Sequence, residues 1–175
     1  MEGKRGYCKE TATLAVARAA LHMWEEPCIS GKKGSGAVFF SGCNLRCVYC
    51  QNYEIAAGQK GKQVSIGRLA EIFLELQDKG AENINLVTPD HHILQVAEAA
   101  ALAKERGLWL PVVYNGSGYE KREIIRELTG IVDIFLTDFK YMDEELAEKY
   151  SSAPDYPAVA KAALGEMVKT AGGPV

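Results

Sequence analysis

The sequence contains no apolar run close to the roughly 20 residues that a bilayer-spanning helix requires. No apolar signal-peptide core follows the charged N-terminal residues 1–5. The basic residues form no stripe with interleaved aromatic residues, and the formal net charge is -3. We therefore expect neither a membrane nor a nucleic acid as a partner.

Cysteine is also scarce, and its arrangement bears on the compartment. Five cysteines are an odd number, and three of them are clustered, which argues against a secreted disulfide framework. The 175 residues are nearly half hydrophobic and a quarter charged, which suffices for one domain with a buried core. We expect a protein of the reducing cytoplasm.

The clustered cysteines are spaced as Cys43-x3-Cys47-x2-Cys50, directly after the apolar run 37–40. Three closely spaced thiolates can bind three irons of a [4Fe–4S] cluster, and the fourth iron then needs a ligand from elsewhere. The sequence has no further cysteine at a matching distance. This cysteine loop, residues 41–52, therefore predicts an iron–sulfur cluster with one iron open to another ligand.

Zinc is the alternative metal for this loop. A structural zinc ion would need a fourth ligand, for which Cys28, His22 and His91 are candidates. Zinc ribbons usually pair two C-x2-C hairpins, so the observed spacing favours the cluster. Cys8 and Cys28 are otherwise expected as ordinary small thiols.

Two charged or titratable pairs outside the loop are expected to be solvated. Glu25 and Glu26 are most simply the solvated end of a helix, and His91 and His92 the first turn of another. The place of His91 at the end of an expected strand also makes it a candidate site residue.

Outside the cysteine loop, the hydrophobic pattern alternates between helical and strand-like segments. Apolar residues spaced by three and four predict a first helix over 12–24, which a proline and the Gly-rich stretch 30–36 bring to an end. Further helices are expected over 65–80, 93–107, 120–128, after Asp143 and over 156–170. Strands are expected at 37–40, 84–87, 110–114 and 132–136.

This alternation indicates an α/β fold with a parallel sheet and right-handed crossovers. We expect about four βα units, arranged as a partial parallel (β/α) barrel that looks truncated at both ends. Residues 1–36 would form an N-terminal helix and a Gly-rich lead-in. Residues 37–175 would form the core, incomplete at its C-terminal end.

Polar side chains follow each of the four expected strands. In parallel sheets the ligand lies beyond the carboxyl ends of the strands, so these groups should share one rim. The groups are the three cysteines, Thr88-Pro89-Asp90-His91, Asn115-Gly116-Ser117, and Asp138-Phe139-Lys140.

The cysteine motif after the first strand of such a series resembles the radical S-adenosylmethionine superfamily. The longer segment 39–52 is similar in sequence to the branch of pyruvate formate-lyase activating enzymes. The similarity continues through residues 83–89, 114–120 and 138–141. It covers nearly the whole chain. The resemblance implies that Tyr49, just before the last cysteine, packs against the adenine of the cofactor.

The resemblance also implies a mechanism and two cofactors, a [4Fe–4S] cluster and S-adenosylmethionine. The amino and carboxylate groups of S-adenosylmethionine would chelate the open iron. One electron would cleave the sulfonium bond and give a 5′-deoxyadenosyl radical that abstracts a hydrogen atom. In the glycyl radical enzyme activators that atom comes from a backbone glycine of a partner enzyme. The electron would come from a flavodoxin- or ferredoxin-like donor.

By position, the resemblance assigns roles to the other strand ends. Asp138 and Lys140 match an Asp-x-Lys beside the nucleoside and are expected as catalytic and cofactor-binding residues. Asn115 and Ser117 fall where related activators contact the cofactor or a cation. Thr88 stands near the place of a Gly-Gly-Glu that grips the methionine amino group, and it would substitute as a hydrogen-bond partner.

Two departures from the family keep a second function open. The Gly-Gly-Glu is absent, and a complete core of this family has more βα units than the four counted here. The preferred function is a radical S-adenosylmethionine enzyme. The alternative is a truncated or non-catalytic iron–sulfur protein that binds a cluster or transfers electrons, and a zinc-stabilised interaction domain is the third.

Overall fold

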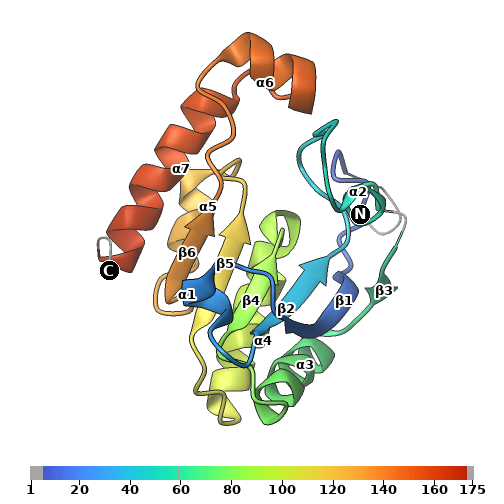
Figure 1. Cartoon of the computed structure of the whole chain (residues 1–175), viewed down its shortest axis with the longest axis vertical. Coiled ribbons are helices and arrows are strands. Elements are labelled where there is room, and N and C mark those ends of the chain that lie inside the picture. Colours follow the sequence, from blue (N-terminus) through green and yellow to red (C-terminus); the bar gives the residue numbers. More distant parts are fainter. Residues whose placement is uncertain (1–5, 59, 173–175) are drawn as a thin grey trace.

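The computed structural model describes residues 6–58 and 60–172, and within them one six-stranded sheet in the order β3-β1-β2-β4-β5-β6 (Figure 1). The strands are β1 (Ala15–His22), β2 (Ser35–Phe40), β3 (Lys62–Gln63), β4 (Ile84–Val87), β5 (Val112–Gly116) and β6 (Ile134–Thr137). The helices are α1 (Pro27–Ser30), α2 (Tyr53–Ala56), α3 (Ile66–Asp78), α4 (Ile93–Glu105), α5 (Arg122–Arg126), α6 (Glu144–Ser151) and α7 (Tyr156–Ala171), with a 3-10 turn η1 (Asp90–His92) before α4.

The four expected βα strands are confirmed as β2, β4, β5 and β6, which pair in parallel. Their registers align Phe39 with Val87, Val87 with Asn115, and Asn115 with Leu136. All four carboxyl ends therefore lie along the same rim. The sheet is not closed, so the α/β fold with a partial parallel barrel is confirmed.

Two helices begin at the capping residues that the sequence indicated. The side chain of Ser65 accepts a hydrogen bond from Arg68 N at 3.1 Å at the start of α3. Asp143 accepts one from Leu146 N at 2.9 Å at the start of α6. The last helix, α7, carries proline in its first turn. The N–H groups there have no partner within the helix, so the N–H that proline lacks is not needed.

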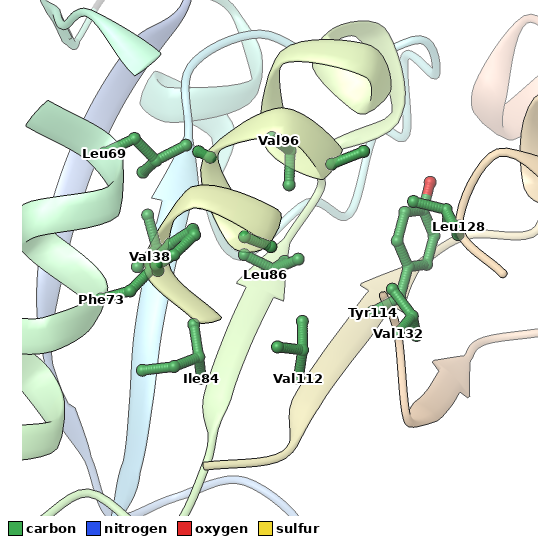
Figure 2. Close-up of a cluster of buried hydrophobic side chains, with 14 of the residues drawn as sticks. Val38, Leu69, Phe73, Ile84, Leu86, Val96, Val112, Tyr114, Leu128 and Val132 are labelled. Carbon is green, nitrogen blue, oxygen red and sulfur yellow. The ribbon is translucent and has the colours of Figure 1, made fainter. Parts of the chain in front are cut away.

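One face of the sheet is apolar and is covered by helices (Figure 2). Alternate strand residues point to this face and meet side chains of α3 and α4: Val38, Ile84, Leu86 and Val112 from the strands, and Leu69, Phe73 and Val96 from the helices. Burying each such side chain contributes about 1.5 to 3 kcal/mol. Because strand residues alternate, Asn85 and Asn115 point to the opposite face.

The predicted helix over 12–24 is wrong, because the structure has the strand β1 there. This strand pairs antiparallel with β2, from Val16 opposite Phe40 to His22 opposite Ser35. Alanine and leucine spaced by three and four fit a helix as well as a strand, and here the pairing with β2 decides. Pro27 does not end a helix but begins the short helix α1.

The division into 1–36 and 37–175 stays a prediction. Its outermost parts, residues 1–5 and 173–175, lie outside the described residues. Among the helices of the described chain, none is long and apolar enough to cross a bilayer.

Candidate functional site

A cavity of about 580 Å³ lies at the carboxyl ends of the parallel strands. The residues expected as metal ligands, cofactor-binding residues or catalytic residues all line it: Cys43, Cys47, Tyr49, Cys50, Thr88, Asn115, Ser117, Asp138 and Lys140. Residues up to 97 positions apart, Cys43 and Lys140, thus face the same space, because the strands run in parallel and end at one rim.

The start of the cysteine loop is held from several directions. Gly42 adopts φ +88°, a conformation that favours glycine, and a Cβ there would stand 2.6 Å from the carbonyl oxygen of Cys8. Ser41 donates its hydroxyl to Glu10 at 2.6 Å, and its carbonyl oxygen lies 2.6 Å from His91 Nε2. Since a carbonyl only accepts, Nε2 carries the proton. The residues just before Cys43 are therefore fixed.

The second half of the loop is held by the end of α6. Backbone N–H groups of Arg46 and Val48 donate to the carbonyls of Ser151 and Tyr150, at 3.0 and 2.9 Å. The Ser151 hydroxyl donates to the sulfur of Cys47 at 2.9 Å. Hydrogen bonds to a thiolate stabilise its charged form, so this contact suits a metal ligand.

The three thiols can be tested against an iron–sulfur cluster. Burial, and next the charge of Asp90, raise the pKa of Cys43 to about 12, so its free thiol stays protonated at neutral pH. A bound cation reverses this preference and deprotonates the thiol. Within the described ranges no three His, Cys, Asp or Glu side chains converge on one point to hold a single ion. The three cysteines line the same cavity, and in an iron–sulfur cluster each thiolate binds a different iron.

Thr88 follows β4 in a strained conformation. Its φ is +56°, a left-handed value that is unusual for a β-branched residue, and its backbone N–H donates to Asn115 O at 2.9 Å. Such strain costs about 1 to 3 kcal/mol and is concentrated at binding sites. The conformation turns the chain at the cavity rim.

Asp138 and Lys140 form an ion pair on the rim, with 2.9 Å between Lys140 Nζ and Asp138 Oδ2. Burial opposes the charge of Lys140, but the hydrogen bond and charge of Asp138 outweigh it and raise the pKa of the lysine. The carboxylate of Asp138 is 76% exposed and has further acceptor capacity. The pair therefore presents a fixed cation and an anion that can accept hydrogen bonds.

Sequence reasoning missed Tyr156, the first residue of α7. Its buried hydroxyl accepts a hydrogen bond from Lys140 N at 2.9 Å and donates to Ser117 O at 2.6 Å. One side chain thus joins the ends of β5 and β6. A tyrosine at a helix start carries no local sign of this role, because both partners come from other parts of the chain.

Sequence reasoning also missed Glu25, which was expected to be solvated. Its side chain is only 14% exposed, lines the cavity, and accepts a hydrogen bond from Asn115 Nδ2 at 3.2 Å. Burial, and next the charge of Glu26, raise the pKa of Glu25. His91 lies beside the loop but does not line the cavity, and His92 is buried, so the solvated first turn is wrong for His92.

Comparison with known proteins agrees with this arrangement. The sequence matches the radical SAM superfamily over residues 37–170. It is 30% identical over 164 residues to the uncharacterized protein MJ0674 of Methanocaldococcus jannaschii, which covers 89% of this chain and 46% of that protein.

Two further relatives carry functional names. The pyruvate formate-lyase-activating enzyme of Clostridium pasteurianum is 29% identical over 117 residues, covering 62% of this chain and 46% of the enzyme. A putative glycyl-radical enzyme activating enzyme of M. jannaschii, MJ1227, is 31% identical over 114 residues, covering 62% and 44%. The chain spans less than half the length of these curated relatives. The match over residues 37–170 shows that the chain belongs to the radical SAM superfamily.

Proposed function

We propose that this chain is the core of a radical S-adenosylmethionine enzyme similar to the glycyl radical enzyme activators. One observation carries the proposal: the three cysteines share a single cavity with the polar ends of β4, β5 and β6. When bound, a [4Fe–4S] cluster and S-adenosylmethionine supply one-electron cleavage of the sulfonium bond and a 5′-deoxyadenosyl radical for hydrogen-atom abstraction.

The thiolates of Cys43, Cys47 and Cys50 hold the cluster in this proposal. The loop that carries them is already fixed on one side by Gly42 and on the other by the end of α6. Little conformational entropy is therefore lost when the loop binds the cluster.

The other wall of the cavity binds and orients the nucleoside cofactor. Tyr49 offers a half-exposed ring for the adenine, and Asp138 and Lys140 offer an acceptor and a donor. Ser117 has a buried hydroxyl without a partner among the described residues, and Thr88 lines the same cavity. The polar side chains of this wall can form the hydrogen bonds that a polar ligand makes with water before it binds.

The test is anaerobic reconstitution with iron and sulfide, followed by reduction with dithionite in the presence of S-adenosylmethionine. We expect about four irons per chain, a broad visible absorbance, and 5′-deoxyadenosine detected by mass spectrometry. Cys47→Ala removes the cluster and the product. Cys28→Ser is the matched control, because Cys28 is exposed and outside the cavity. An intact reduced cluster that yields no 5′-deoxyadenosine would contradict the enzyme proposal.

That last outcome would support the second candidate, an iron–sulfur protein that binds a cluster or transfers electrons. The observation in its favour is the open sheet, with β6 as its last described strand. The partners proposed for the enzyme are a glycyl radical enzyme as substrate and a flavodoxin- or ferredoxin-like electron donor. Mixing the reduced protein with such a partner and recording a glycyl radical by electron paramagnetic resonance tests the first of these.

A further inference from the structure

The segment between β1 and α1 contributes a wall of the cavity that the cofactor proposal does not use. Trp24, Glu25 and Glu26 all line the cavity, and Trp24 is 89% exposed at its rim. Figure 1 shows this segment running across the sheet from the end of β1 to α1. A tryptophan beside two carboxylates needs an explanation, because exposed aromatic side chains at a cavity commonly bind a ligand.

This wall is held in place by buried hydrogen bonds. Asn83, 4% exposed, accepts from Ser35 Oγ at 2.6 Å and donates to Ile29 O at 2.7 Å. Ser30 Oγ donates to the carbonyl of Glu25 at 3.1 Å. The backbone of Glu25 is therefore fixed before any ligand arrives, which lowers the entropy cost of binding.

The carboxylate of Glu25 lacks a full counter-charge. Among the described residues, its ionisable neighbours are Glu26, which repels it, and His22, whose Nε2 lies 3.9 Å from Oε1. Arg18 lines the same cavity, but within the described ranges it forms no ion pair with Glu25. Asn115 donates the neutral hydrogen bond already noted. A carboxylate that is 86% buried beside a like charge is unfavourable alone and is stabilised by a cation.

A second, independent observation lies behind Glu25. Asn85 is fully buried, and neither its amide nitrogen nor its amide oxygen has a partner in the described part of the chain. It points to the same face of the sheet as Asn115 and lies close enough to act on the Glu25 carboxyl. Asn85 does not itself line the cavity, but it lies behind the Glu25 carboxyl, which does. Buried amides almost always have partners, so an unpaired one behind this carboxyl marks a place where a further polar group can complete the site.

We propose that Glu25, with Glu26 and Trp24 beside it, binds a positively charged ammonium or guanidinium group of the substrate. The two carboxylates supply charge-assisted acceptors, and the indole supplies a cation–π face. A substrate that presents a lysine or arginine side chain, or another alkyl amine, has this chemistry. That the cation belongs to a substrate rests on the proposed function. The binding of the cation itself can be tested without turnover.

The test uses the fluorescence of Trp24 in a Trp109→Phe background, since the chain has two tryptophans. The cationic probe is N-acetyl-L-lysine methylamide, and the neutral probe of similar shape is N-acetyl-L-norleucine methylamide. We expect saturable binding of the lysine probe and about 10- to 100-fold weaker binding of the norleucine probe.

Glu25→Gln should weaken the binding of the lysine probe about tenfold or more and leave the binding of the norleucine probe unchanged. Glu71→Gln, on the exposed face of α3, is the matched control. Circular dichroism checks that each variant is folded. If Glu25→Gln does not fold, Glu26→Gln provides the same comparison, with a smaller loss. Equal affinity of the two probes, or no effect of these substitutions, would overturn the proposal.

S-adenosylmethionine also carries an ammonium group, so a second arm separates the two sources. On the reconstituted protein, the lysine probe should bind with the same affinity at saturating S-adenosylmethionine. Displacement of the probe by S-adenosylmethionine would assign Glu25 to the cofactor and overturn a substrate role. Formation of 5′-deoxyadenosine is measured separately. Its absence would refute the proposed enzyme function while leaving the cation site intact.

Discussion

The hydroxyl of Ser151 lies 2.9 Å from the sulfur of Cys47, although the two residues are 104 positions apart in the chain. The same serine is fully buried at the end of α6 and contacts the hydroxyl of Tyr141 at 2.7 Å. A hydrogen bond to a ligating sulfur is a second layer of support for a metal site. In the proposed enzyme, this contact would connect the stability of the cluster to a helix far away in the sequence.

Ser151→Ala tests this connection. Removing the hydroxyl removes its contact with Tyr141 and its hydrogen bond to Cys47. The bond to Cys47 alone contributes about 0.5 to 1.5 kcal/mol, so a reconstituted cluster should lose iron to a chelator about two- to tenfold faster. The measurement is the decay of visible absorbance under anaerobic conditions. Thr170→Ala at the end of α7 is a control that should not change the rate. Equal rates for all three proteins would show that the contact does not support the cluster.

Gly42→Ala tests the start of the cysteine loop. Gly42 and Gly80 have similar φ values, +88° and +83°, but only Gly42 has close neighbours for an added Cβ. Gly80→Ala should therefore cost about 1 to 2 kcal/mol of unfolding free energy from φ alone. Gly42→Ala should cost about 1 to 3 kcal/mol more from the clash with Cys8 O. Urea unfolding of both variants measures the difference, and equal losses would argue against a tight approach at Gly42.

Tyr156→Phe tests the junction between the ends of β5 and β6. The variant leaves Lys140 N and Ser117 O without their buried partner, so we expect a loss of about 1 to 3 kcal/mol. Thermal unfolding measures it. Tyr150→Phe, on the exposed side of α6, removes a hydroxyl at the surface and should change stability by less than about 0.5 kcal/mol. If both tyrosine variants behave alike, the bridging hydroxyl contributes nothing to the fold.

His92 gives a prediction for pH. It is 1% exposed, both ring nitrogens lack partners among the described residues, and burial, then the neighbouring His91, lower its pKa to about 4. Between about pH 6.5 and 4 the unfolded chain binds a proton that the folded chain does not, so stability falls as the pH falls through this range.

His92→Leu places an apolar side chain at this buried position and removes the titration. Between pH 7 and pH 5, wild type should lose about 1 to 2 kcal/mol more unfolding free energy than the variant. His22 and His91 are present in both proteins, so their contributions cancel in the comparison. Parallel pH profiles of the two proteins would contradict a neutral buried His92.

The parts of the fold that could be predicted from the sequence are those with local signals. The cysteine spacing, the caps at Ser65 and Asp143, and the four apolar strands each depend on residues close together in the chain. Strand β1 could not be separated from a helix, because its pairing with β2 is a contact between distant residues.

The same distinction divides the candidate site. The rim residues were found because strand ends of a parallel sheet converge whatever their sequence. Glu25 and Tyr156 were not found, because their roles come from Asn115, Ser117 and Lys140, each at least 16 positions away. The burial of His92 likewise involves a distant part of the chain, because its ring centroid lies 6.5 Å from that of Phe40 in β2.

The attachment of the cysteine loop to α6 has a consequence for the order of assembly. A ribosome releases Cys43, Cys47 and Cys50 long before Ser151, so the nascent loop lacks its second support while most of the later chain is still being made. If the proposed cluster is bound, lasting insertion of iron and sulfide would therefore follow synthesis of the helix α6. Maturation of the proposed enzyme would then depend on a segment that contributes no ligand.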